Sequence, residues 1–419
     1  MHNRFQPQSE YSKNVLTLMT GSTLSQAIPI AISPILTRIY TPEDFGLYAV
    51  YIAIITILGT IVSGRYELAI MLPKKDEDAI NIFALGLVIT ICLTVLTTIL
   101  VITFNDYIVN LSNNQKMKYW LYIVPVSVFL MGCYNLLIYF NNRLKNFNKI
   151  SNMFIFRASS SAVVQLSLGF IKTGATGLIS GQIFSQLMAD IHLSIIIFRN
   201  KILLSKINKP KMIEMAKRYR DFPKYSVLAI LANKLSYQLT NIIVSAIYSI
   251  TTLGYYAHVQ RVLGLPSSLI GTSIGRVFIH EASKEKQNTG KAIQTFKSTM
   301  KKLILIGLPI FAFLFMIVED LFAFVFGEPW RIAGEYAQIV IPFFFVQFII
   351  SSISSTETIM EKQNLDLLFN IAILAGSMIV IVVSSSFGFK IFLINWAIVI
   401  SLLYVIYGFV LMKMADGKI

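Results

Sequence analysis

Apolar stretches of about 20 residues recur along almost the whole chain, and this repetition limits its fold more than any other feature. A stretch of that length crosses the hydrocarbon core of a bilayer as an α-helix, which pairs its backbone N–H and C=O groups within itself. Charged residues make up only 14% of the 419 residues, against about 25% in a typical soluble domain. The first stretch begins near Asn14 and has no small-residue cleavage site, so we expect a retained helix and not a signal peptide.

The pattern predicts an all-α polytopic membrane protein of about twelve transmembrane helices. We expect these helices at residues 14–39, 44–66, 79–104, 119–141, 151–172, 177–199, 223–248, 253–276, 301–323, 336–358, 367–387 and 389–412. The loops that would face outward are short, the longest being about 105–118 and 319–335. They leave no room for an extracytoplasmic domain.

The net charge of +15 comes mainly from the loops. If the N-terminus lies inside, the inner flanks hold 28 of the 36 Lys and Arg residues and the outer flanks hold six. By the positive-inside rule, we expect both termini in the cytoplasm and the protein in the cell inner membrane. The densest cluster holds nine cations between Arg199 and Lys224 and needs no partner beyond anionic headgroups, so we expect no nucleic-acid binding.

A short internal repeat divides the chain into halves. Residues 39–49 match residues 247–257 at an offset of 208, with five identical positions. Each segment follows the first helix of a group of six and opens the second, which predicts two six-helix lobes related by a parallel repeat. We place the lobes at 1–212 and 213–419, joined by a basic cytoplasmic linker at about 200–222. Such a chain can rock one lobe against the other around a central cavity.

Polar side chains at membrane depth mark the candidate cavity, because a charge there costs at least about 2.5–3.5 kcal/mol. Lys234 lies near the middle of the helix at 223–248. It begins a polar stripe that continues through Gln238 and Asn241. Amides offer hydrogen bonds to sugar hydroxyls, and fixed cations offer charge-assisted bonds to phosphate. The candidate substrate-binding residues are Lys234, Arg261, Arg38, Arg65, Gln26, Gln238, Asn241 and His258.

Other interpretations of these residues stay open. Polar stripes also serve as hydrogen-bonded packing between helices, and Arg261 is near enough to the outer surface to snorkel. His258 is a proton site or a neutral histidine bonded at a helix interface. Arg65 and Glu67 form either an inner gate between the lobes or a topology anchor where the second helix meets the cytoplasm.

Several chemistries have no sequence support. The chain lacks a G-x-x-x-x-G-K-[ST] phosphate loop and any H-E-x-x-H or paired Cys/His spacing, so we expect neither ATP hydrolysis nor a metal cofactor. Cys92 and Cys133 lie inside apolar stretches as small core residues. The acidic run at residues 76–78 follows two lysines and is typical of a solvated loop. We therefore expect a transporter and not an enzyme.

Three segments resemble the N-terminal signature of the polysaccharide transporter family, the O-antigen and capsule repeat-unit flippases of the multidrug/oligosaccharidyl-lipid/polysaccharide exporter superfamily. They are GSTLSQAIP at 21–29, SPILTRIYTPEDFG at 33–46 and RYELAIMLP at 65–73. The rest of the chain is similar in length, helix count and two-lobe organisation. Family cations differ between members, so the assignment of Lys234, Arg261, Arg38 and Arg65 rests on depth and stripe alone.

The resemblance implies a function. An undecaprenyl-diphosphate carrying one oligosaccharide repeat unit would move from the cytoplasmic to the periplasmic leaflet, through a V-shaped cavity between the lobes with cations for the diphosphate. A proton, a sodium ion or the membrane potential would drive the cycle. A polysaccharide polymerase and a chain-length regulator would be partners in lipopolysaccharide O-antigen synthesis.

Two other functions compete with flipping. A multidrug or small-molecule efflux antiporter of the same superfamily would be expected to carry buried carboxylates, and here Asp190 and Glu357 are the only deep acidic candidates. A polytopic polysaccharide polymerase would need a sizeable extramembrane loop with catalytic groups, and the outer loops are too short.

Overall fold

The computed structural model describes residues 10–112, 115–362 and 364–418. The chain forms two compact units, Met1–Lys234 and Leu235–Ile419, which we call the N lobe and the C lobe and describe one at a time. The division falls within one helix, later in the chain than the boundary that the sequence predicts at residue 212. In the described ranges, every regular element of both lobes is a helix, which confirms the all-α fold class.

Each of the twelve predicted segments is helical in the structure. Among the described residues, ten helical stretches are long and apolar enough to cross a membrane, and a pair bent by 42°, Phe222–Leu235 and Tyr237–Ile247, makes an eleventh. The remaining predicted span is α1 (Glu10–Ile39), a 30-residue helix with many Ser and Thr residues that is not among those eleven. Multiple spans of this kind make the chain a multi-pass membrane protein.

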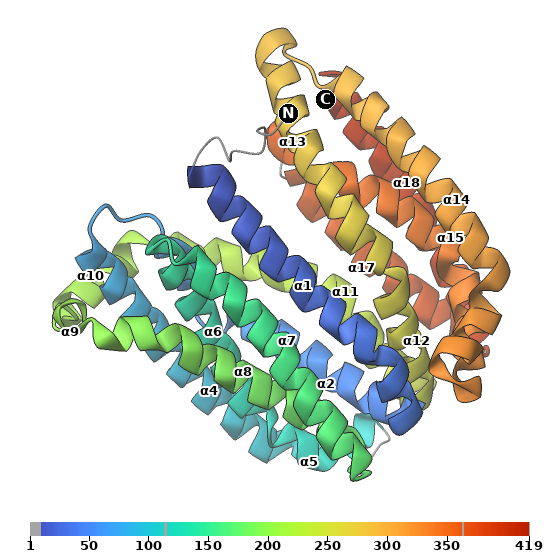
Figure 1. The fold of residues 1–419 in the computed structure, drawn as a ribbon, viewed down its shortest axis with the longest axis horizontal. Helices are drawn as coiled ribbons and strands as arrows, with labels where there is room; N and C mark the ends of the chain where they lie inside the picture. Colours follow the sequence, from blue (N-terminus) through green and yellow to red (C-terminus); the bar gives the residue numbers. More distant parts are fainter. Residues whose placement is uncertain (1–9, 113–114, 363, 419) are drawn as a thin grey trace, which may run out of the picture. The chain divides into compact units, whose positions relative to one another are not determined.

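The N lobe is built around a long helix. Its elements are α1, α2 (Pro42–Ile61), α3 (Tyr66–Ala69), α4 (Asp76–Ser112), α5 (Met117–Leu121), α6 (Val124–Arg143), α7 (Phe147–Phe170), α8 (Ala175–Arg199), α9 (Lys201–Leu204), α10 (Lys209–Arg218), η1 (Phe222–Ser226) and the start of α11 (Val227–Ile247). The 37 residues of α4 span about 55 Å, more than the roughly 30 Å of a hydrocarbon core. The helices α1, α7 and α8 lie side by side (Figure 1).

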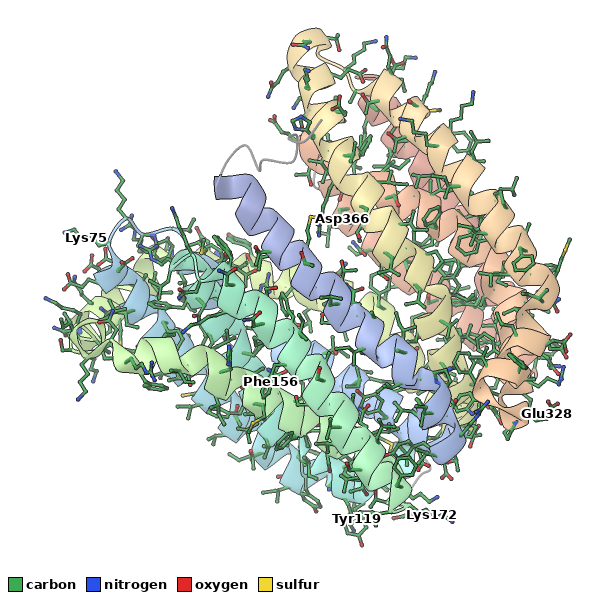
Figure 2. All side chains as sticks on the ribbon, viewed as in Figure 1. Lys75, Tyr119, Phe156, Lys172, Glu328 and Asp366 are labelled. Carbon is green, nitrogen blue, oxygen red and sulfur yellow. The ribbon has the colours of Figure 1, made fainter. Side chains whose placement is uncertain are left out.

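The loops of the N lobe alternate between its two ends. Figure 2 shows Lys75, just before α4, at one end of the lobe, and Tyr119 and Lys172 at the opposite end. The core near the Lys75 end draws buried side chains from α3, α4, α6, α7, α8 and α10, including Tyr66, Ile80, Phe140, Met153, Leu193 and Met215. Helices that run back and forth between two ends are what the alternating cationic and neutral loops predict.

The C lobe contains interrupted helices. Its elements are the remainder of α11, α12 (Ile250–Leu263), η2 (Ser267–Gly271), α13 (Thr272–Thr289), α14 (Ile293–Phe326), η3 (Glu328–Trp330), α15 (Arg331–Ile353), α16 (Thr356–Ile359), α17 (Asn364–Ser384) and α18 (Phe389–Ala415). Pro266 immediately precedes η2, a single π-helical turn. Proline removes one backbone donor, and a π turn is a common response to that loss.

The internal repeat has the same hydrogen bond in both lobes. The Tyr40 hydroxyl donates to the Gln165 carbonyl oxygen at 2.6 Å, which joins the end of α1 to α7. The Tyr248 hydroxyl donates to the Ser384 carbonyl oxygen at 2.9 Å, which joins the end of α11 to α17. In each lobe the tyrosine at the end of the first spanning helix therefore holds the fifth.

The residue after each tyrosine caps the next helix. Thr41 accepts the Asp44 backbone N–H at 3.2 Å at the start of α2, and Asp44 completes a capping box. Ser249 accepts the Thr252 backbone N–H at 2.9 Å at the start of α12. A hydroxyl at this position pairs one of the free donors of the first helical turn. The matched segments of the sequence are thus matched structural elements.

Candidate functional site

The C lobe contains a cavity of about 550 Å³ between α11, α12, η2, α15, α17 and α18. Five aromatic side chains line it: Tyr237, Phe343, Phe344, Trp396 and Tyr404. The other lining residues are Gln238, Thr240, Asn241, Gln260, Gly264, Ser267, Ser268, Gln347, Ser351, Ile373, Ser377 and Ile400. Among the described residues, no charged side chain lines the cavity.

Two hydrogen bonds hold the cavity wall. Gln347 on α15 donates its side-chain N–H to the Tyr404 hydroxyl on α18 at 3.3 Å. The indole N–H of Trp396 on α18 donates to the Ser377 hydroxyl on α17 at 3.2 Å. Both bonds fix an aromatic ring at the cavity surface by its polar end, which sets the direction of the ring face. The wall is therefore pre-organised.

Other lining groups still have hydrogen-bonding capacity. The Asn241 side-chain N–H donates to the side-chain oxygen of Gln238 at 3.4 Å, one helical turn away on α11. The side-chain oxygen of Asn241 and the hydroxyls of Thr240 and Ser267 are buried and make no hydrogen bond within the described residues. A buried polar atom without a partner costs about 1–3 kcal/mol, which a bound ligand or water offsets.

The lining is suited to a neutral, hydroxyl-rich ligand. Amides and hydroxyls both donate and accept hydrogen bonds, as sugar hydroxyls do. Aromatic faces offer flat apolar surface against which the C–H face of a sugar ring packs. A volume of about 550 Å³ lies within the range of small-molecule pockets. The cavity is large enough for part of an oligosaccharide.

Two of the predicted site residues meet in this cavity, whereas His258 lies elsewhere in the lobe. Gln238 and Asn241 both line it, as the polar stripe on their helix indicates. The His258 ring is buried against Phe326 and Trp330, at ring-centre distances of 4.5 and 4.7 Å. His258 thus faces an aromatic cluster contributed by α14 and η3, and it is not among the residues that line the cavity.

The two predicted deep cations lie near breaks in their helices. Lys234 is partly buried, directly before the point where the pair Phe222–Leu235 and Tyr237–Ile247 bends by 42°. Arg261 is also partly buried, next to the lining residue Gln260 on α12. Lys234 is the last residue of the N lobe and Arg261 belongs to the C lobe. Their role in binding phosphate stays a prediction.

The two remaining predicted binding residues of α1 are exposed. Gln26 donates to the Ser22 carbonyl oxygen and to the Ser22 hydroxyl, both at 3.3 Å. These bonds stay within one turn of α1. Arg38 lies in the last turn of the helix, where a cation also interacts favourably with the helix dipole. A role for either residue in the substrate path stays a prediction.

The predicted gate pair forms a local cluster in the N lobe. The Arg65 guanidinium lies 3.1 Å from the Glu67 carboxylate, and the Ser63 hydroxyl donates to the same carboxylate at 2.5 Å. Glu67 is 1% exposed. Burial raises the pKa of Glu67 above its ordinary value, while the Ser63 bond and the Arg65 charge act in the opposite direction. The structure therefore contains this ion pair in the segment between α2 and α4, and its gating role stays a prediction.

The deep carboxylates bond to neighbours in their own lobes. Asp190 on α8 accepts from the Gln186 side chain at 3.3 Å. Glu357 on α16 accepts a short hydrogen bond from the Tyr407 hydroxyl on α18. Neither carboxylate is among the residues that line the C-lobe cavity. The cavity chemistry is therefore that of hydroxyls, amides and rings, in contrast to the anionic pocket expected for cationic drugs.

Sequence reasoning missed several lining residues. Gln260 stands between His258 and Arg261 and was not part of the stripe that those two residues define. Gln347 is one of only two amides, with Gln338, inside the apolar stretch 336–358. An uncompensated amide in an otherwise apolar membrane helix is itself a signal, because it needs a hydrogen-bond partner at that depth. Trp396 and Tyr404 carry no such signal, since aromatic residues are common in membrane spans.

The fold is similar to that of solved transporters. A multidrug resistance MATE family transporter of the MOP superfamily, in an inward-facing conformation, has a TM-score of 0.70 at 13% identity, with 97% of each chain covered. The lipid II flippase MurJ, in an inward closed conformation, also has a TM-score of 0.70 at 13% identity, with 97% of this chain and 90% of that chain covered. A MOP superfamily transporter from Pyrococcus furiosus has a TM-score of 0.65 at 13% identity, covering 97% of this chain and 95% of that chain. At such identities these likenesses establish the fold alone.

Sequence comparison identifies the family. The succinoglycan biosynthesis transport protein ExoT of Rhizobium meliloti (strain 1021) is 20% identical over 331 residues, which cover 77% of this chain. The match spans 64% of the length of that relative. The sequence profile of a family described as "Polysaccharide biosynthesis protein" matches residues 35–335, well over half of the chain. The chain therefore belongs to this polysaccharide biosynthesis protein family.

Proposed function

We propose that this protein is a flippase that moves undecaprenyl-diphosphate-linked oligosaccharide repeat units from the cytoplasmic to the periplasmic leaflet by alternating access. The observation that carries the proposal is the uncharged cavity of the C lobe, whose amides, hydroxyls and rings are suited to sugars. Family membership supports a role in polysaccharide biosynthesis. The shared fold supports transport, because one solved neighbour is a lipid II flippase and ExoT is a transport protein of succinoglycan biosynthesis.

The substrate would be recognised by two kinds of side chain. Gln238, Asn241 and Gln347 would exchange hydrogen bonds with the sugar hydroxyls in the cavity. Lys234 and Arg261 would bind the diphosphate, because a fixed cation forms charge-assisted bonds with phosphate oxygens that a neutral amide cannot match. In this proposal the protein binds and reorients its substrate and catalyses no covalent step.

The setting of the protein follows from the same proposal. It would lie in the inner membrane with both termini in the cytoplasm, as the distribution of Lys and Arg predicts. A proton, a sodium ion or the membrane potential would drive the cycle. A polymerase and a chain-length regulator would use the repeat unit after it reaches the periplasmic leaflet.

Efflux of small molecules is the second candidate function, and the MATE fold favours it. The two functions differ in what accumulates when the protein is lost. We expect deletion of the gene to leave lipid-linked repeat units in the cytoplasmic leaflet, measured by leaflet-selective labelling of the glycan. Normal polysaccharide export with altered drug sensitivity would favour efflux and overturn the flippase proposal.

Lys234 tests the phosphate part of the proposal. We expect Lys234→Ala to abolish surface polysaccharide while the protein stays in the membrane, since the diphosphate loses its partner near the midplane. Lys224→Ala is a matched control, because Lys224 is an exposed cation ten residues earlier in the chain. Normal glycan with full expression of Lys234→Ala would remove this residue from the site.

A further inference from the structure

A groove with an apolar floor and a cationic rim lies on the N lobe, apart from the residues assigned above. It has a volume of about 450 Å³ between α4 and α10. Leu85 of α4 and Met212, Ile213 and Ala216 of α10 form the floor. The rim consists of the remaining lining residues, Lys209, Lys217 and Arg220. Apolar lining beneath three cations is the surface that an amphiphilic anion would fit.

The helix that forms the groove is fixed to the lobe. Met215 and Tyr219 are buried in the core described above. The Asn208 backbone N–H donates to the Asn81 side-chain oxygen of α4 at 2.8 Å, which holds the start of α10. The Tyr66 hydroxyl donates to the Ala216 carbonyl oxygen at 3.2 Å. The groove is therefore a built feature of the N lobe and not a chance contact of a loose linker.

Among the cations along α10 and just after it, Lys211 is neutralised, whereas the three at the rim of the groove are available. Lys211 lies 3.2 Å from Glu77 and 3.4 Å from Asp78, at the acidic start of α4. Lys209, Lys217 and Arg220 are exposed, and no ion pair joins them to an acidic residue in the described chain. The protein thus pairs the cation that faces α4 and leaves positive charge on the rim of the groove.

The groove continues into a surface that faces lipid. Leu85 begins a series on α4 in which every third or fourth residue is a large, exposed apolar side chain: Val88, Ile91, Val95, Ile99 and Ile102. A row with that spacing lies on one face of a helix. Exposed apolar side chains on a membrane-spanning helix are covered by acyl chains. Ile213, which is 47% exposed, extends the same apolar surface onto α10.

We propose that this groove binds one anionic phospholipid. Its phosphate would lie against Lys209, Lys217 and Arg220, and the first part of an acyl chain would lie along Leu85 and Ile213. Charge complementarity selects an anionic headgroup, because a zwitterionic lipid offers the same acyl chains without net charge. A bound lipid would fasten α10 to the leaflet that carries it. The inference depends on the membrane setting of the chain and not on the transported substrate.

Lipid binding to the full-length protein tests this site. The delipidated protein in detergent is titrated with phosphatidylglycerol or phosphatidylcholine, and bound lipids are counted by native mass spectrometry. We expect one phosphatidylglycerol to bind at least tenfold more tightly than phosphatidylcholine. The triple variant Lys209→Gln, Lys217→Gln, Arg220→Gln should lose that preference. All three side chains are exposed, so we expect an unchanged unfolding temperature.

A matched variant separates a site from general charge. Lys297→Gln, Lys301→Gln, Lys302→Gln removes the same charge from three exposed lysines of α14. This α14 variant should still bind one phosphatidylglycerol tightly. Ile213→Gln keeps the charge and should weaken binding several-fold through the apolar floor. Equal loss in both triple variants would overturn the proposal, as would equal binding of the two lipids. Full displacement by inorganic pyrophosphate would also overturn it, since an anion site without an acyl-chain site would then explain the rim.

Discussion

The two lobes share the repeat at the start of their second spanning helix, yet they use the amide side chains of their helices in different ways. In the N lobe, Gln165 on α7 donates to the Leu178 carbonyl oxygen on α8 at 3.2 Å, so the amide joins two neighbouring helices. In the C lobe, Gln238, Asn241 and Gln347 lie at the wall of a cavity. Shared local geometry at the start of each lobe thus leads to a packed amide in one and an accessible amide in the other.

The size of the side chains between helices explains part of this difference. In the N lobe, a Cβ at Gly177 would lie 2.0 Å from the Tyr40 hydroxyl, and one at Gly181 would lie 2.5 Å from the Gln165 side chain. These glycines let α8 approach its neighbours closely. In the C lobe, Phe343 and Trp396 pack ring to ring at 4.9 Å between α15 and α18. Rings hold helix axes further apart than glycines do, which leaves room for a cavity.

The largest expected effect comes from exchanging amides for leucine in the two lobes. Gln347→Leu should lower transport of lipid-linked repeat units about tenfold or more, because a cavity hydrogen bond to sugar of about 1.4 kcal/mol is lost. The Tyr404 ring also loses the bond that orients it. The measurement is the rate of leaflet transfer per folded molecule in reconstituted vesicles.

Gln165→Leu is the counterpart in the N lobe. It should reduce stability by about 1 kcal/mol through the lost bond to Leu178, while transport per folded molecule stays near normal. A drop in transport of similar size for both variants would end the distinction between a structural and an accessible amide. Protein yield and unfolding temperature in detergent separate the two kinds of loss.

An effect on stability alone is expected when the close approach of helices is disturbed. Gly177→Ala should destabilise the N lobe by about 1–3 kcal/mol, because its Cβ would overlap the buried Tyr40 hydroxyl. In Gly376→Ala in α17, the added Cβ would lie 3.0 Å from the end of the Leu403 side chain and at ordinary contact distance from Val399 and Ile400. The flexible Leu403 side chain can move, and alanine favours a helix, so the free energy of unfolding should hardly change. Thermal unfolding of both variants is the measurement, and equal destabilisation would contradict the packing argument.

Much of this architecture is predictable from sequence because it depends on local periodicity. Apolar runs gave the twelve helical segments, and the match of residues 39–49 to 247–257 marked the same tyrosine and cap in both lobes. The stripe through Gln238 and Asn241 identified part of the cavity, since residues three apart share a helix face. These features require knowledge of a single helix at a time.

The rest depends on contacts between segments far apart in the chain. His258 shares a helix face with polar residues, but Phe322, Phe326 and Trp330 come from more than 60 residues later and bury it. Gln347 and Tyr404 meet only because α15 packs on α18. Periodicity states which face of a helix is polar; it does not state which neighbour covers that face.

The smallest expected effect concerns the repeated tyrosines themselves. Tyr40→Phe and Tyr248→Phe each remove one hydroxyl that donates to a backbone carbonyl. The free energy of unfolding should fall by about 1 kcal/mol for Tyr40→Phe, because Tyr40 is only 3% exposed. It should fall by about 0.5 kcal/mol for Tyr248→Phe, because Tyr248 is less buried. Hydrogen–deuterium exchange should rise in α2 and α7 for the first variant and in α12 and α17 for the second. Changes confined to the mutated lobe would show that each repeat stabilises its own six-helix unit. Equal changes in both lobes would contradict that independence and indicate that the two units unfold together.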